Sequence, residues 1–181
     1  GCNGCSRCCH GMGNSIILDP YDVYRMTTGM GKSMQELLAA SVELNVVDGV
    51  ILPNLKMQGA EEACAYLDGR GRCSIHPYRP GICRLFPLGR YYENGGFSYF
   101  LQTGECAKEN RSKIKVSKWI DTPDLTRNQQ FTLQWHDLLH AMEERLTGED
   151  EGKQREENLL LLRLFYLLPY EGTIDFYTQF T

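Results

Sequence analysis

Eight cysteines give this chain its clearest chemical signature, because half of them fall within the first nine residues. A C-x-x-C turn brings two sulfurs around one metal ion, since the two intervening residues let the backbone fold over it. A third cysteine at the same spacing reproduces the ligand run of bacterial iron–sulfur proteins. The eight thiolates would complete two centres of four ligands each. The candidate ligands are Cys2, Cys5, Cys8, Cys9, Cys64, Cys73, Cys83 and Cys106.

A disulfide framework is the alternative use of so many cysteines, and three observations argue against it. Such frameworks belong to short secreted chains, whereas 181 residues can bury an adequate core. The sequence does not open with a basic segment followed by an apolar one, as a secretory signal would. A bridge between the neighbours Cys8 and Cys9 would also strain the peptide that joins them. We therefore expect metal-binding thiols in a cytoplasmic protein.

Composition narrows the class of partner. Hydrophobic residues make up 42% of the chain, charged residues 23%, and the net charge of −4 gives no reason to expect nucleic acid. The longest apolar run, Leu159–Leu168, contains Arg163 and is shorter than the roughly 20 residues that a membrane-spanning helix needs. We expect neither a nucleic-acid nor a membrane partner.

Local patterns predict the elements of the N-terminal half. Ile16–Leu18 is typical of a short strand, and Asp19-Pro20 predicts a helix that stops near Gly29. Ser33 and Glu36 form a capping box for a second helix, which would run through Val42. Residues 46–57 favour β structure, interrupted at Pro53.

The cysteine-rich middle of the chain predicts two hairpins around an irregular loop. Residues 64–75 would turn at 68–71, pairing Leu67 with Arg72 and Tyr66 with Cys73. Cys64 and Cys73 would then lie within reach of a shared centre. Three prolines in residues 76–87 predict a tight irregular turn carrying Cys83, and Asn94-Gly95 predicts the second hairpin.

The C-terminal third is helical in pattern. Thr122-Pro123 would open an amphipathic helix that Gly148 ends, and a last helix would cover residues 153–168. The apolar stripe of the first of these two helices is Phe131, Trp135, Leu138, Met142 and Leu146. The sequence therefore predicts an α+β fold, with a cysteine-cluster domain over residues 1–116 and a helical extension over 117–181 packed on it.

The cysteine run, the pair Cys64 and Cys73, and the segment RPGICRLFP at 79–87 together resemble the YkgJ-like cysteine-cluster family. The resemblance covers about residues 2–106 and ends with Cys106 as the late cysteine of the family pattern. It implies a domain that chelates zinc or iron. A similar cluster occurs in the flagellin lysine N-methylases, where it is associated with an iron–sulfur cluster. This chain has no glycine-rich loop after a strand that would suggest an adenosylmethionine pocket.

Five arginines and no carboxylate occupy residues 70–90, beside two of the candidate ligands. One interpretation is charge balance, because four thiolates around Zn²⁺ carry a net charge of −2. The other is an anion or substrate site next to the metal. The residues proposed for either role are Arg72, Arg79 and Arg84, together with His10 and His76 next to candidate ligands. His136 and His140 have the spacing of a zinc pair, but His136 is not followed by the glutamate of a metalloprotease.

Two classes of function are consistent with these residues. We expect a metal-binding protein, with zinc or an iron–sulfur cluster in two centres, acting as a binding or regulatory module. A protein partner would dock on its C-terminal helices. The alternatives are an iron–sulfur oxidoreductase or electron-transfer protein, and an accessory to protein lysine methylation. The spacing of the N-terminal cysteines favours an iron–sulfur cluster in at least one centre. Because neighbouring side chains diverge, we expect Cys8 and Cys9 to serve different centres.

Overall fold

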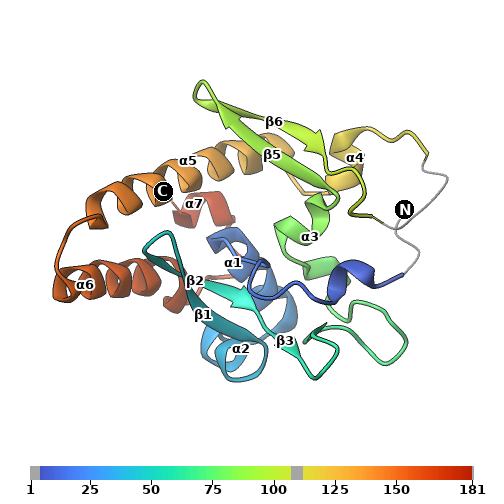
Figure 1. The fold of residues 1–181 in the computed structure, drawn as a ribbon, viewed down its shortest axis with the longest axis horizontal. Helices are drawn as coiled ribbons and strands as arrows, with labels where there is room; N and C mark the ends of the chain where they lie inside the picture. The colour runs from blue at the N-terminus through green and yellow to red at the C-terminus, as the bar shows by residue number, and fades with distance from the viewer. Residues whose placement is uncertain (1–4, 107–111, 181) are drawn as a thin grey trace.

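The computed structural model describes residues 5–106 and 112–180, and it has the expected α+β architecture (Figure 1). Seven α-helices and three two-stranded antiparallel sheets occur in these residues. Figure 1 shows α6 at the left end of the molecule, with α3 and β3 to the right of its middle. Across the described ranges, no helix is both long and apolar enough to cross a bilayer.

The first two helices begin where the sequence predicts. After the 3₁₀ turn η1 (Arg7–Cys9), α1 (Pro20–Met30) and α2 (Met34–Ala40) each start with a complete capping box. The prediction that the second helix runs through Val42 was wrong. Val42 instead begins a strand and pairs with Leu55, because the hairpin that follows recruits it into its ladder.

That hairpin consists of β1 (Val42–Val47) and β2 (Val50–Leu55). It turns at Asp48-Gly49, whose φ angles of 51° and 81° are those of a tight hairpin turn, and the predicted interruption at Pro53 was wrong, because β2 continues to Leu55. Pro53 lies within β2 and accepts the N–H of Leu18, a position that an edge strand tolerates. The predicted strand at 16–18 is a single bridge from Ile17 to β2.

The middle segment contains β3 (Met57–Gln58), β4 (Ala63–Cys64), η2 (His76–Tyr78) and α3 (Gly81–Leu85). The predicted pairings of Leu67 with Arg72 and of Tyr66 with Cys73 were wrong by one residue, since Leu67 bridges Cys73. The Asp68 carboxylate explains the longer loop, because it accepts the N–H groups of Arg70 and Arg72, both at 2.9 Å. The second hairpin, β5 (Leu88–Glu93) and β6 (Gly96–Leu101), turns at Asn94-Gly95 as predicted.

Four helices follow: α4 (Val116–Ile120), α5 (Leu125–Leu146), α6 (Glu151–Leu162) and α7 (Phe176–Phe180), with a wide turn η3 (Arg163–Leu167) continuing α6. The apolar stripe of α5 packs inward as expected, with Phe131 and Trp135 buried. One core joins both ends of the chain, and Leu18, Met26 and Tyr166 are among its least exposed members. The division at residue 116 stays a prediction.

Candidate metal centre

Five cysteine thiols from four separate segments converge in the structure. They come from η1, β4, the loop before η2, and α3, and are Cys8, Cys9, Cys64, Cys73 and Cys83, each a free thiol. Burial raises the pKa of Cys64, Cys73 and Cys83, and negative charge on neighbouring cysteines raises it further. This mutual electrostatic effect indicates that the thiols lie in one region of the molecule. We call them the five-thiol group.

Cys8 and Cys9 make direct contact within this group. The thiol of Cys9 donates a hydrogen bond that lowers the pKa of Cys8 to about 6, and the same bond, with burial, raises the pKa of Cys9. Both also interact electrostatically with Cys64 and Cys83. The assignment of Cys8 and Cys9 to different centres stays a prediction.

The other three candidate ligands lie around the group or outside the described residues. Cys5 is exposed just before η1, and Cys106 is half-buried a few residues after β6. Cys2 lies outside the described residues. Within 5–106 and 112–180, no three side chains of His, Cys, Asp or Glu are already arranged to share one ion.

One face of α1 holds the segment that carries Cys73 and Cys83. The carboxylate of Asp22 accepts the N–H of Gly81 at 2.6 Å, and Arg25 donates to the carbonyl of Pro77 at 2.5 Å. The ring of Tyr78 packs directly on Gly29. Positions 22, 25 and 29 are three and four residues apart, so they share one helix face. Helix α1 is therefore the platform for this part of the centre.

Replacing Gly29 by alanine should displace this segment, because the added Cβ would overlap the Tyr78 ring. Overpacking of this kind costs about 1–3 kcal/mol, more than the gain in helix propensity. Denaturant unfolding of Gly29→Ala measures the loss. Gly69→Ala is the matched control, since a Cβ at that position meets nothing within 4 Å. The double variant Gly29→Ala/Tyr78→Ala should recover part of the loss, and equal stability of Gly29→Ala and wild type would contradict the packing argument.

The arginines of residues 70–90 divide between two tasks. Arg84 is buried and donates to three backbone carbonyls: Arg79 at 3.2 Å, Asp121 at 2.8 Å and Pro77 at 2.6 Å. Trp119 of α4 adds a bond from its indole N–H to the carbonyl of Phe86. These bonds fix α3 against the η2 loop and α4.

Arg79 acts electrostatically on two of the five thiols. Its positive charge favours the thiolate forms of Cys8 and Cys73 and so lowers their pKa values against the effect of burial. Arg72 and Arg70 are exposed, and Arg70 pairs with Asp68 at 3.4 Å. Arg79 therefore fits the charge-balance interpretation, whereas Arg84 has a structural role through its bonds to backbone carbonyls.

The sequence profile of the CxxCxxCC family, described as “Putative zinc- or iron-chelating domain”, matches residues 1–134 of the 181. The chain belongs to the CxxCxxCC family. The matched range contains all eight cysteines and the whole platform of α1. No curated protein and no solved structure matches the chain significantly.

The donor set fits the metals named for the CxxCxxCC family. Thiolate sulfur is the ligand that selects zinc and iron–sulfur clusters, whereas magnesium and calcium prefer oxygen. The Nε atom of Arg79 is buried and has no hydrogen-bond partner among the described residues. A half-buried cation whose charge acts on Cys8 and Cys73, and whose N–H is unused, is suited to a negatively charged metal–thiolate centre.

The histidines have lesser roles. His10 bonds the carbonyl of Ser6 through Nδ1 at 3.0 Å, and His76 is exposed, with its pKa lowered by partial burial and by the charges of Arg79 and Arg84. His136 stacks on Tyr92 with ring centroids 3.8 Å apart, so it packs β5 against α5. His136 therefore has a packing role between these two elements.

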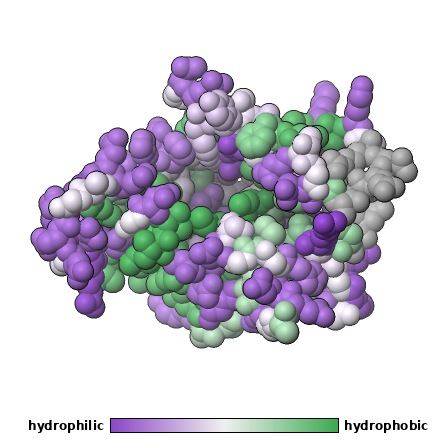
Figure 2. Space-filling view, in the orientation of Figure 1, coloured by the Kyte–Doolittle hydropathy of each residue, from purple (hydrophilic) through white to green (hydrophobic). Residues whose placement is uncertain are grey.

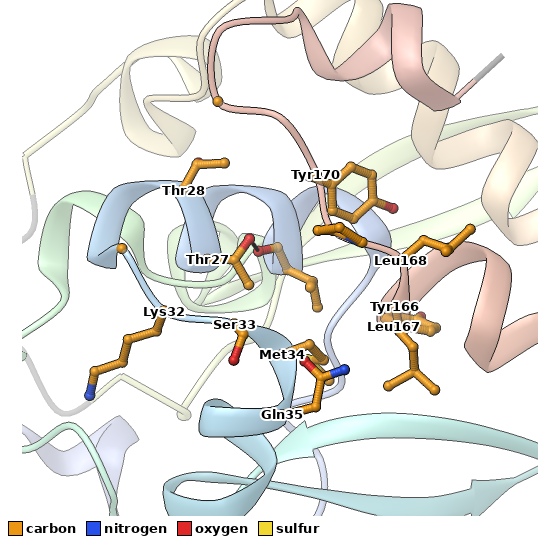
Figure 3. A pocket seen from close by; sticks show the side chains of 14 residues that line it. Thr27, Thr28, Lys32, Ser33, Met34, Gln35, Tyr166, Leu167, Leu168 and Tyr170 are labelled. Atoms are coloured by element: carbon orange, nitrogen blue, oxygen red, sulfur yellow. Dashed lines mark hydrogen bonds between the residues drawn. The ribbon is translucent and has the colours of Figure 1, made fainter.

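Sequence reasoning missed the platform residues Asp22, Arg25 and Gly29. Their spacing on one helix face was visible, but nothing local indicates that a loop 50 or more residues away would dock there. A cavity of about 420 Å³ on another side of α1 was also missed (Figure 3). Figure 3 shows Thr27, Met34 and Tyr170 around it. No cysteine is among the residues that line it in the described part of the chain, so it is separate from the thiols.

Proposed function

We propose that the five-thiol group binds zinc or iron as thiolates, with Cys2, Cys5 and Cys106 supplying the remaining ligands. The observation that carries this proposal is the convergence of five thiols from four segments. Thiolates supplied by several segments of a chain are the ligands with which proteins hold structural zinc and iron–sulfur clusters. Ionised thiols repel one another, so we expect the sulfurs to close up only around a cation.

The number of ligands supports two centres, because the eight cysteines provide two sets of four. We propose that at least one of them holds an iron–sulfur cluster in the cell, on the strength of the N-terminal spacing. Zinc would tie the segments together, and an iron–sulfur cluster would add the ability to accept an electron. The chain's own contribution is to hold the thiols on η1, β4 and α3 and to place Arg79 beside them.

We further propose a role as a binding or regulatory module that docks on another protein. Exposed apolar side chains on the C-terminal helices support this role. Leu159, Leu160 and Leu164 are 53%, 51% and 50% exposed. Figure 2 shows hydrophobic side chains gathered over α6 and the β1–β2 hairpin.

Elemental analysis of the full chain, produced with ample iron and purified without oxygen, tests the metal proposal. We expect close to two metal centres per chain, and a brown protein with visible absorbance from at least one iron–sulfur cluster. A colourless protein with stoichiometric zinc would contradict the assignment of iron while leaving metal binding intact. A folded, metal-free protein with paired disulfides would contradict the proposal as a whole.

A further inference from the structure

Two guanidinium groups share one backbone carbonyl in the η2 turn, and a third arginine, Arg79, follows that carbonyl two residues later. Arg25 and Arg84 both donate to the carbonyl of Pro77, at 2.5 and 2.6 Å. Arg84 also donates to the backbone carbonyl of Arg79 at 3.2 Å, which brings Arg79 to the same turn. His76 lies at the edge, where the charges of Arg79 and Arg84 act on it. We call Arg25, Arg79, Arg84 and His76 the arginine cluster.

The arginine cluster has no carboxylate of its own. Among the described residues, none of its three arginines is within ion-pair distance of an Asp or Glu, although Arg70, Arg127 and Arg145 all have such partners. Asp22 and Asp121 act on Arg84 only at longer range, and the oxygens of Asp22 accept backbone N–H groups of Gly81 and Asp19. Like charges held this close are unfavourable unless an anion offsets them.

The cluster also has unused donors. Nη1 of Arg25 and Nε of Arg79 are buried and have no hydrogen-bond partner in the described structure. A buried donor without a partner is costly, and such groups call for an explanation. Arg25 belongs to α1 and Arg79 to the loop before α3, so the unused donors come from two separate elements.

We propose that the arginine cluster binds a small doubly charged oxyanion, the phosphate group of a ligand. The guanidinium fork matches the oxygens of phosphate, and several cations together favour a double charge over a single one. His76 and Pro77 are exposed, so the cluster lies at the surface where a ligand can enter. The charge of Arg79 also acts on Cys8 and Cys73, so the proposed anion site adjoins the five-thiol group. This site goes beyond metal binding and does not require it.

Calorimetric titration of the full chain, as purified with its metal, with inorganic phosphate at fixed ionic strength tests the site. We expect saturable binding of one phosphate per chain, weakened at least about tenfold in Arg25→Gln and in Arg79→Gln, since each removes a charge-assisted bond. Arg25→Lys should retain part of the affinity. Arg70→Gln is the matched control, because its side chain is 89% exposed and pairs with Asp68, and it should bind phosphate like wild type.

The outcomes separate this site from the metal centre when metal content is measured on every sample. Failure of the metal-loaded protein to bind phosphate saturably would overturn the site, as would Arg25→Gln binding as tightly as wild type. Acetate binding as tightly as phosphate would overturn the assignment to a doubly charged group. Saturable phosphate binding by a chain that contains no metal would support the site and contradict only the proposed metal function.

Discussion

Replacing Cys8 or Cys9 by serine is expected to remove about one metal centre per chain and to lower the free energy of unfolding by several kcal/mol. Structural zinc contributes on the order of 10 kcal/mol to the folding of small domains, and serine cannot replace a thiolate ligand. Here the larger hydrophobic core retains part of the stability. Elemental analysis and denaturant unfolding of each variant measure the two effects.

The double variant Cys8→Ser/Cys9→Ser distinguishes one centre from two. If the neighbours serve different centres, each single variant keeps about half of the metal and the double variant keeps almost none. If they share a centre, the double variant loses no more metal than either single one. His10→Gln is the control, because His10 follows Cys9 directly but bonds Ser6. Full metal content in both single variants would contradict the ligand assignment itself.

Replacing Arg84 by methionine should destabilise the protein by about 3 kcal/mol, since three charge-assisted bonds are lost and the carbonyls of Arg79 and Asp121 are left without this donor, while that of Pro77 keeps Arg25. Methionine fills much of the same volume, so the loss reports the hydrogen bonds more than a cavity. Because these carbonyls belong to the η2 loop and α4, the variant should also retain less metal. Thermal unfolding and metal content measure both consequences.

Two further variants calibrate this expectation. Arg84→Lys should recover only part of the stability, because one ammonium group cannot reach the carbonyls of Pro77, Arg79 and Asp121 together. Arg72→Met, at an exposed position, should change the free energy of unfolding by no more than about 0.5 kcal/mol. An Arg84→Met protein as stable as wild type would show that solvent satisfies these carbonyls.

Local chemistry was predictable from the sequence. The helix start at Asp19-Pro20, the capping box at Ser33 and the turn at Asn94-Gly95 each depend on residues within four positions of one another, and all three form as expected. The same kind of evidence was available at Asp48-Gly49, where the dipeptide marks the β1–β2 turn more strongly than Pro53 marks a break.

Long-range contacts explain what the sequence did not reveal. Val42 continues the helical spacing of Leu38, yet pairing with Leu55 makes it a strand residue. The hairpin register at Leu67 depends on the Asp68 carboxylate, which accepts the backbone N–H of Arg72. Secondary-structure propensities do not include such a bond. The spacing of the cysteines identified candidate ligands, but only the fold shows that the charge of Arg79 acts on two of them and that α1 carries the loop.

X-ray absorption at the edge of the bound metal tests the central claim most directly, because it reports the atoms around the metal in the protein as purified without oxygen. We expect a first shell that consists of sulfur alone. For zinc this means about four sulfurs at about 2.3 Å, and a cluster would add iron neighbours to them. A first shell dominated by nitrogen or oxygen would contradict binding by the cysteines.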